Sequence, residues 1–472
     1  MTTTQSFHDL NSILQRMKKA HLDTGPASAE LRQDRLQRAI DLITDNQKAL
    51  TQAMSDDFGH RAEYQSLVAD VVTTVNGLMH AKSNVKQWMQ PQPVFGLEGD
   101  RSAHIQQQPL GVVGVISPWN FPINLAFGPL AGVFAAGNSA MLKPSELTPR
   151  TSELLAELVA RYFDPMELAV VLGDADVGQA FSQLPFDHLV FTGSTAVGKH
   201  VMRAAAENLV PVTLELGGKS PVLVAPDADI THAVQRTMTV KTFNVGQICL
   251  SPDYVLVHKD HLEQWASASK QFVAQSFATI ADNPDYTSII NQRHFERLTG
   301  LLDDAKQKGA TIISLAPNNE PSIDQATRTI APHLILNVND DMAIMQEEIF
   351  GPLLPVKTYE QEQQAIDYIN QHPRPLAAYY FSDDEQRQEY FAQHTTSGAL
   401  IINDIMTHAS IDALPFGGVG PSGMGAYHGI HGFNNFTHAK AVVVHEQSDD
   451  ASERLRAPYQ DKADALKQAF GQ

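Results

Sequence analysis

Three side chains in this sequence have the types and surroundings that nucleophilic chemistry requires, and the first is a cysteine. Cys249 is the only cysteine among 472 residues, and it follows Gly246-Gln247-Ile248. A lone cysteine is most often a small buried hydrophobic residue. Here Gly246 allows a tight turn that can expose a backbone N–H beside the sulfur. This setting favours a nucleophile.

The second side chain is a glutamate in an apolar setting. Glu215 stands between Leu214 and Leu216 and is followed by Gly217-Gly218-Lys219. Such a carboxylate is hard to explain as a solvated surface charge, and it can serve as a base for a thiol or for a water molecule. The alternative is a charge on an edge strand, or an ion pair with Lys219.

The third side chain is an asparagine in a rigid turn. Asn120 lies in Pro118-Trp119-Asn120-Phe121-Pro122, where two prolines and two aromatic residues restrict the backbone. Its amide can donate a hydrogen bond to an oxyanion that develops during a reaction. The alternative is an asparagine that satisfies the backbone of its own turn.

These residues must be positioned by the elements around them, and strands alternate with helices between residues 104 and 216. Such alternation predicts an α/β fold with a parallel, doubly wound sheet. Ligands bind such sheets at the carboxyl ends of the strands. The predicted strands are the apolar runs at 112–116, 140–142, 168–172, 188–191 and 210–214.

Two of these strand ends carry residues suited to a nucleotide. Lys143 and Glu146 leave one strand together, and a cation beside a carboxylate suits the hydroxyls and phosphates of a nucleotide ribose; a surface ion pair is the alternative. Gly193 and Ser194 follow another strand and open a helix, where backbone N–H groups can hold a pyrophosphate. The spacing G-x₄-G matches neither the Rossmann fingerprint nor the Walker loop.

The rest of the chain suggests further organisation around these motifs. Residues 1–90 have a helical pattern, and a second set of strands and helices begins after Gly217-Gly218. Glu215 and Cys249 therefore lie close to a predicted domain boundary, where clefts often form active sites. His428, His431 and His438 lack carboxylate or cysteine co-ligands nearby, so we predict no metal site.

Composition excludes several classes of function. The net charge of −19 leaves no basic excess for nucleic acid. One cysteine excludes an intramolecular disulfide and fits a reducing compartment. The N-terminus lacks a basic-then-apolar signal and no run of eighteen apolar residues occurs, so we expect a soluble cytoplasmic protein with no membrane contact.

Seven motifs, the five described above and two nearer the C-terminus, resemble in their order the aldehyde dehydrogenase superfamily along nearly the whole chain. Within it the chain is similar to the class 3 branch, and there to the bacterial coniferyl-aldehyde dehydrogenases, which share Asp57-Phe58-Gly59-His60-Arg61. The seven matching stretches are 118–122, 142–146, 191–194, 214–219, 246–249, 348–352 and 415–418.

The resemblance implies a mechanism for oxidising an aldehyde, aromatic such as coniferaldehyde or medium-chain aliphatic, to its acid. The Cys249 thiolate would add to the aldehyde carbon, and the Asn120 amide and the Cys249 N–H would hold the oxyanion. Loss of hydride would give a thioester, which water activated by Glu215 would hydrolyse.

The resemblance also implies NAD as the cofactor, with NADP as an alternative because the class 3 branch often accepts both. Ile248 stands where relatives often have a smaller or polar residue, which leaves the substrate preference open. The positions that the resemblance assigns to cofactor binding are Ser117, Trp119, Lys143, Glu146, Gly193, Ser194, Glu348 and Phe350.

The implied architecture is the aldehyde dehydrogenase fold, with a Rossmann-like cofactor domain, an α/β catalytic domain and a small β arm for oligomerisation. Arms of this kind add strands to a partner's sheet, so we expect a homodimer. The predicted boundaries are 1–90 with 110–217 for the cofactor domain, 218–417 for the catalytic domain, 91–109 with 437–447 for the arm, and 448–472 for the tail.

Two rival functions fit the same motifs. In a CoA-acylating relative, CoA rather than water would resolve the thioester, and a water-activating Glu215 would be superfluous. In a catalytically silent member of the fold, the chain would bind or pack without turnover. The joint presence of Cys249, Glu215 and Asn120 favours a hydrolytic enzyme over both.

Overall fold

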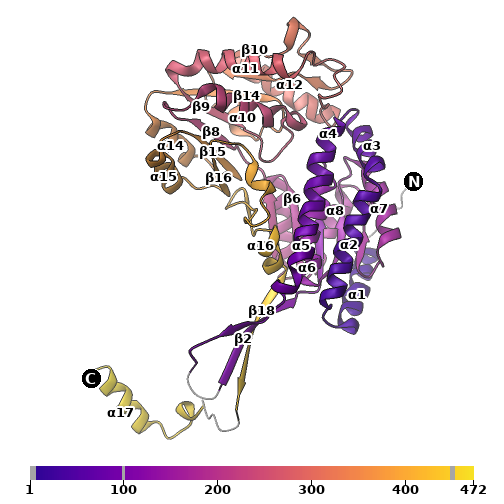
Figure 1. Cartoon of the computed structure of the whole chain (residues 1–472), viewed down its shortest axis with the longest axis vertical. Helices are drawn as coiled ribbons and strands as arrows, with labels where there is room; N and C mark the ends of the chain where they lie inside the picture. The colour runs from indigo at the N-terminus through magenta and orange to yellow at the C-terminus, as the bar shows by residue number, and fades with distance from the viewer. Residues whose placement is uncertain (1–6, 98–100, 447–451, 472) are drawn as a thin grey trace.

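The computed structural model describes residues 7–97, 101–446 and 452–471, and two large β-sheets organise it (Figure 1). The chain begins with a helical stretch that ends just before Pro91, as the sequence predicts. Leu36, Ile40 and Ile43 are buried on one face of it. The stretch comprises α1 (Phe7–Thr24), α2 (Ala29–Asp45), α3 (Gln47–Phe58), α4 (Glu63–Ser66), the π-helix η1 (Leu67–Val72) and α5 (Thr73–Trp88).

The first large sheet has the strand order β17-β7-β6-β3-β4-β5 and is parallel except for β17. Neighbouring residues of one strand face opposite layers, so Val112 packs toward α1, α8 and α9 while Val113 packs toward α2, α5 and α6. The strands are β3 (Val112–Ile116), β4 (Ser139–Lys143), β5 (Leu168–Val170), β6 (His188–Gly193), β7 (Val212–Leu216) and β17 (Gly423–Met424); the helices are α6 (Asn124–Ala136), α7 (Pro149–Tyr162), α8 (Ala175–Ser182) and α9 (Thr195–Ala206).

The second large sheet has the order β10-β13-β14-β9-β8-β15-β16 and is parallel except for β10. Its strands are β8 (Pro221–Val224), β9 (Tyr254–His258), β10 (Thr311–Ser314), β13 (His333–Leu336), β14 (Leu353–Tyr359), β15 (Ala377–Phe381) and β16 (Ala399–Ile402).

Helices and short turns connect these strands and complete this half of the molecule. They are α10 (Ile230–Thr242), η2 (Phe243–Gly246), η3 (Lys259–His261), α11 (Leu262–Ser276), α12 (Gln292–Gln307), η4 (Pro317–Asn319), α13 (Ala343–Gln346), α14 (Glu362–Gln371), α15 (Glu385–His394) and η5 (Thr407–Ser410), with a small hairpin of β11 (Ile323–Asp324) and β12 (Thr329–Ile330).

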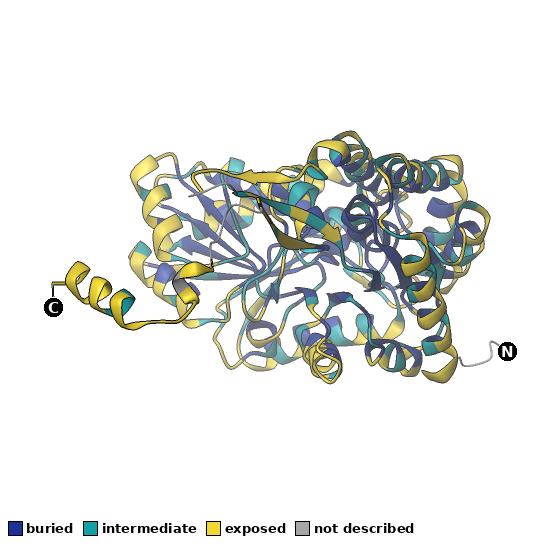
Figure 2. Ribbon diagram, turned by 90° about the horizontal axis from the view of Figure 1, so that it is seen from below, coloured by how far each residue is buried: buried dark blue, intermediate teal, exposed yellow. Residues whose placement is uncertain are grey.

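A third sheet projects from the body as a narrow arm (Figure 1). It is antiparallel, and its strands β1 (Gln92–Val94), β2 (Arg101–Pro109) and β18 (Thr437–His445) come from the two ends of the chain. Beyond it lie η6 (Glu453–Leu455) and the exposed helix α17 (Gln460–Ala469), drawn in yellow in Figure 2. Residues 447–451 of the predicted arm and tail fall outside the described residues.

The division into domains stays a prediction, and the structure adds one segment to it. Residues 418–436, which the predicted boundaries omit, supply β17 on the first sheet and α16 (Gly429–Asn435), which packs against α6. The chain therefore returns to its first half before it forms the arm. Among the described helices, none is long and apolar enough to cross a membrane.

Candidate active site

The cysteine lies just after a strained turn that joins α10 to the second sheet. Asn244, Val245 and Gly246 have φ angles of 47°, 53° and 70°, so three successive residues adopt the left-handed region. A Cβ on Gly246 would lie 2.4 Å from the Gly351 carbonyl oxygen, which explains the glycine. The turn leaves the Cys249 thiol half-buried at the wall of a cavity.

Glu215 projects from β7 on the first sheet, and its surroundings exclude the ion pair with Lys219. Lys219 instead pairs with Asp253 and donates to the carbonyl oxygens of Ile344 and Glu347. Among the described residues, neither carboxyl oxygen of Glu215 has a hydrogen-bond partner. Burial raises the pKa of Glu215 well above its ordinary value, so the carboxyl binds a proton strongly.

Asn120 connects the turn after β3 to the cysteine loop. Its Nδ2 donates to the Gln247 carbonyl oxygen at 3.2 Å, and its own carbonyl oxygen accepts from Asn244 Nδ2 at 3.2 Å. The side chain is 3% exposed. Because its amide reaches another loop, the alternative of an asparagine that satisfies its own turn is wrong.

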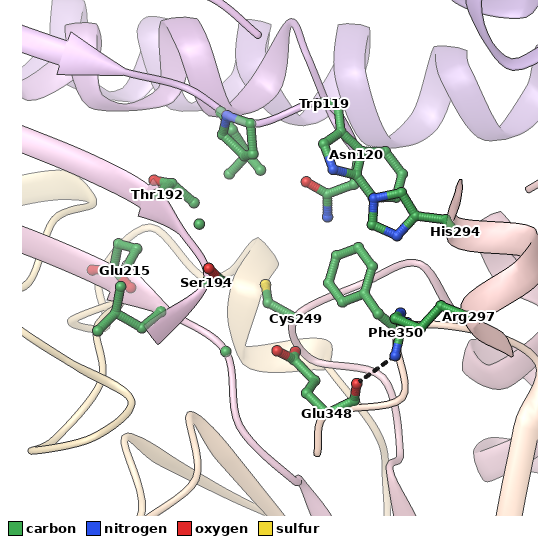
Figure 3. Close-up of a pocket in the computed structure, with 15 residues that line it drawn as sticks. Trp119, Asn120, Thr192, Ser194, Glu215, Cys249, His294, Arg297, Glu348 and Phe350 are labelled. Carbon is green, nitrogen blue, oxygen red and sulfur yellow. Dashed lines mark hydrogen bonds between the residues drawn. The ribbon is translucent and has the colours of Figure 1, made fainter. Parts of the chain in front are cut away.

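One cavity of about 290 Å³ brings most of the predicted residues together between the two large sheets (Figure 3). Cys249 reaches it from the second half of the chain, whereas Asn120 and Glu215 reach it from the first sheet. Predicted residues that line it are Trp119, Asn120, Gly193, Ser194, Glu215, Cys249, Glu348 and Phe350.

Burial opposes ionisation of the thiol in the free protein. Burial, together with the Glu348 and Glu215 carboxylates, raises the pKa of Cys249 to about 12. Burial and then the charge of Asp253 raise the pKa of Glu348 to about 8. Figure 3 shows the Glu348 carboxyl group turned toward Cys249, and its Oε1 lacks a partner among the described residues.

Comparison with known proteins places this fold and site in a family. The sequence matches the aldehyde dehydrogenase family over residues 2–442. It is 57% identical over 450 residues to the coniferyl aldehyde dehydrogenase of Pseudomonas sp. strain HR199, covering 95% of this chain and 94% of that protein. The chain belongs to the aldehyde dehydrogenase family. It is an NAD(P)-dependent aldehyde oxidoreductase, as the resemblance predicted.

Two further relatives extend this comparison. The aldehyde dehydrogenase is 37% identical over 453 residues to the rat protein named aldehyde dehydrogenase, dimeric NADP-preferring, covering 95% of this chain and 97% of that one. The substrate-bound structure of Staphylococcus aureus AldH superimposes with a TM-score of 0.92 at 35% identity, covering 98% of this chain and 99% of the other. The predicted fold is therefore confirmed.

Three residues predicted to bind the cofactor lie outside the main cavity of this aldehyde dehydrogenase. Lys143 Nζ pairs with Glu146 at 2.8 Å, and Glu146 lines a second hollow with Leu172, Gly173 and Val177. Ser117 is buried, and its N–H donates to the Lys143 carbonyl oxygen at 3.1 Å. The pair of Lys143 with Glu146 is the alternative that the sequence analysis gave for these two residues. The hollow that Glu146 lines could still hold a ligand.

Two ionisable cavity residues lie outside the motifs that the sequence analysis identified, and both come from α12. His294 packs on Trp119 with ring centroids 5.1 Å apart, and Arg297 Nη1 donates to the Glu348 carbonyl oxygen at 3.2 Å. Burial, reinforced by Arg297, lowers the pKa of His294 to about 4, so this ring is neutral near pH 7. No local motif marks them, because only tertiary packing brings α12 to the cavity.

The histidines considered as metal ligands do not form a cluster. His428 is half-buried and stacks on Phe416 with centroids 4.8 Å apart, whereas His438 belongs to the arm. Within the described ranges, no group of three or more His, Cys, Asp or Glu side chains has a geometry that could hold a metal ion.

Proposed function

We propose that this aldehyde dehydrogenase oxidises aromatic aldehydes of the coniferaldehyde type to their acids, with water as the final nucleophile. The observation that carries the mechanism is the convergence of Cys249, Glu215 and Asn120 on one cavity. The name of the relative that is 57% identical supports the substrate class. The rings of Trp119 and Phe350, with centroids 5.4 Å apart, line the same cavity.

The first step is addition of the Cys249 sulfur to the aldehyde carbon, with loss of the thiol proton. A carbon–sulfur bond forms and the carbonyl oxygen becomes an oxyanion. The Asn120 amide and the Cys249 backbone N–H stabilise this oxyanion, and each such donor is typically worth about 10²–10³ in rate. Asn120 Nδ2 already points toward the cysteine loop, 3.2 Å from the Gln247 carbonyl oxygen.

The cavity fits a dinucleotide on three observations of this chain. Ser194 caps the N-terminus of α9, which favours a phosphate. The Glu348 Oε1 lacks a partner among the described residues, so it can accept from ribose hydroxyls. Glu146 lines the second hollow and pairs with the buried Lys143, where the two suit an adenosine ribose. We assign Ser117, Trp119, Gly193 and Phe350 to the same cofactor.

Resolution of the acyl intermediate falls to Glu215. When bound, NAD or NADP supplies the acceptor for the hydride that the thiohemiacetal carbon gives up, which leaves a thioester on Cys249. Glu215 takes a proton from water, the water oxygen attacks the acyl carbon, and the bond to sulfur breaks to release the acid. Glu215 lines the cavity together with Cys249, and its carboxyl oxygens have no hydrogen-bond partner among the described residues, which leaves them available to a water molecule.

We propose NAD as the preferred cofactor, with NADP accepted more weakly. The Glu146 carboxylate opposes a ribose 2′-phosphate by charge, as acidic residues do in other dinucleotide sites. Lys143, which pairs with Glu146 at 2.8 Å, partly neutralises this charge. We also propose a cytoplasmic location, since a single cysteine fits a reducing compartment.

A homodimer joined through the arms completes the proposal. β18 is an edge strand of the arm, and its Val443 and Val444 side chains are 53% and 56% exposed in the single chain. Exposed apolar edge strands tend to pair with other chains. A second copy of this chain would cover the edge, and the dimeric rat relative supports this assembly.

The proposal is tested by acid production from coniferaldehyde, benzaldehyde and hexanal, with NAD and NADP separately and with CoA added in parallel. Products are separated by chromatography, because the absorbance of coniferaldehyde hides that of the reduced cofactor. We expect ferulic acid to form fastest with NAD, and CoA to leave the product unchanged. Equal rates on hexanal and coniferaldehyde would contradict the aromatic preference. An acyl-CoA product would show that CoA, rather than water, resolves the thioester.

A further inference from the structure

A fully buried ion pair lies beside the active site without touching the cavity. Arg61 Nη2 and the Asp70 Oδ2 are 2.9 Å apart, and both side chains are 0% exposed. The Arg61 guanidinium lies over the rings of Phe58 and Phe121, at 5.0 and 5.2 Å from their centroids. Arg61 ends the Asp57–Arg61 stretch, for which the sequence suggests no chemistry.

The other oxygen of Asp70 reaches the turn that carries Asn120. Asp70 Oδ1 accepts from the backbone N–H groups of Ile123 and Asn124 at 3.0 and 3.1 Å. These amides open α6, and no side chain of the turn itself caps that helix. Asp70 therefore supplies the missing cap from a different element, and its charge also complements the positive end of the α6 dipole.

The local shape of the chain places Asp70 for this contact. Asp70 lies in η1, a six-residue π-helical segment between α4 and α5. A π-helical turn widens the helix, and such turns occur frequently at functional sites. The Thr74 hydroxyl donates back to the Asp70 carbonyl oxygen and accepts from Asn124 Nδ2 at 3.1 Å. The start of α6 is thus held at two points.

The helical turn that precedes η1, α4, also holds the loop of the nucleophile. Gln65 Oε1 accepts from the Asn244 N–H at 2.9 Å and from the Thr287 hydroxyl at 3.0 Å. Asn244 in turn donates to the Asn120 carbonyl oxygen. α4 lies where the N-terminal helices meet the half that carries the second sheet (Figure 1). Residues 61–74 therefore contact both loops whose N–H groups would surround the oxyanion.

We propose that Asp70, oriented by Arg61, is a positioning residue that fixes Asn120 relative to Cys249 during formation of the thiohemiacetal. A buried ion pair is weak support for stability, because desolvation of two charges offsets their attraction. The contacts of Asp70 with Ile123 and Asn124 instead fix the geometry of the turn that carries Asn120. The inference rests on the proposed role of Asn120 as the oxyanion donor.

A double-mutant cycle on turnover separates positioning from a general structural role. Asn120→Ala removes the donor, and we expect kcat/KM to fall about 10²–10³-fold. Asp70→Asn loses the charge that Arg61 holds, and a small displacement of Asn120 lowers kcat/KM roughly 10- to 100-fold. If Asp70 acts through Asn120, adding Asp70→Asn to Asn120→Ala changes kcat/KM by less than about 2-fold.

Three controls keep the experiment decisive. The dissociation constant for NAD, measured by fluorescence, should change less than about 3-fold in Asp70→Asn, since the pair does not contact the cofactor cavity. Glu167→Gln breaks a comparable contact with Arg35 and Arg38 away from that cavity and should leave kcat/KM unchanged. If Asp70→Asn does not fold, Arg61→Lys keeps the charge, loses the planar contact with two rings, and should show the same non-additivity.

The outcomes distinguish this inference from the proposed function. If Asp70→Asn lowered kcat/KM by the same factor in the wild type and in Asn120→Ala, the positioning role would be overturned. The proposed mechanism would be unaffected. Undiminished turnover in Asn120→Ala would instead remove the oxyanion role of Asn120. An unchanged kcat/KM in Asp70→Asn would also contradict the inference.

Discussion

At the scale of single residues, burial favours the protonated forms of the ionisable groups in the cavity. Cys249, Glu215 and Glu348 lie in one cavity, and burial raises the pKa of each of them. The free protein therefore avoids three adjacent negative charges.

The pKa of Glu348 predicts how stability depends on pH. Glu348 binds its proton up to about pH 8 in the folded protein, against an ordinary value of 4.5. Between these values the folded state keeps a proton that the unfolded state has released, so the free energy of unfolding falls as pH rises. The contribution of the Glu348 carboxyl to the free energy of unfolding is therefore fully present below about pH 4.5 and is lost above about pH 8.

Glu348→Gln should therefore flatten this dependence. Each pKa unit corresponds to about 1.4 kcal/mol, so we expect the variant to gain a few kcal/mol over the wild type near pH 8 and much less near pH 5. Urea denaturation of the cofactor-free protein at the two pH values measures the difference. Glu263→Gln, an exposed carboxylate on α11, serves as the control. If the free energy of unfolding depended on pH equally in Glu348→Gln and the wild type, the raised pKa of Glu348 would be contradicted.

The sequence identified the residues that line the cavity where a local motif contains them. Asn120 and Gly193 come at the carboxyl ends of parallel strands, which meet at one edge of a sheet. His294 and Arg297 lie inside an ordinary amphipathic helix, and nothing nearby in the sequence marks them as cavity residues. Lys143 and Glu146 were predicted together, but their mutual ion pair depends on side-chain geometry.

At the scale of elements, the turn before Cys249 is the most demanding piece of backbone in the site. Gly246 must adopt a φ of 70°, and a Cβ there would meet the Gly351 carbonyl oxygen at 2.4 Å. Gly246→Ala should therefore displace the cysteine loop and lower kcat/KM roughly 100-fold. Steady-state kinetics together with urea denaturation measures both the catalytic loss and the loss of stability.

Gly309→Ala is the matched control for backbone strain alone. Gly309 has a φ of 95°, but no atom lies within 4 Å of a Cβ placed there. Both variants lose about 1–2 kcal/mol of stability from the left-handed conformation. Only Gly246→Ala should lose turnover, and equal turnover in the two variants would show that the turn does not control the nucleophile.

The elements themselves were predicted unevenly. The strand at Val112–Ile116 matches its apolar run, whereas β7 extends through Glu215 to Leu216, beyond the predicted 210–214. The π-helical segment η1 was not predicted, because Val68, Val71 and Val75 fit an ordinary helical face. Asp70 is buried within that segment, and its partner Arg61 could not be identified without the fold.

At the scale of the whole molecule, the arm predicts an assembly. Light scattering should give twice the mass of one chain for the wild type. Val443→Lys places a charge on the exposed edge of β18 and should shift the protein toward monomers. Ile323→Lys, on the distant β11–β12 hairpin, should leave the mass unchanged. A monomeric wild type would contradict the proposed dimer.

The two halves of the molecule also divide the proposed chemistry between them. Glu215 belongs to the first sheet and Cys249 to the loop that leads into the second, so the site exists only where the halves meet. The central claim is that the first residue resolves a thioester formed on the second. Glu215→Gln separates these steps because it keeps the shape of the side chain and removes the base.

The most direct measurement is a rapid-quench experiment on Glu215→Gln with coniferaldehyde and NAD. We expect one equivalent of reduced cofactor per active site, then a stall, with an acyl group on the peptide that contains Cys249 in mass spectrometry. The same experiment on Cys249→Ser should show neither burst nor adduct. Continuous turnover of Glu215→Gln at the wild-type rate, without an acyl adduct, would contradict the account.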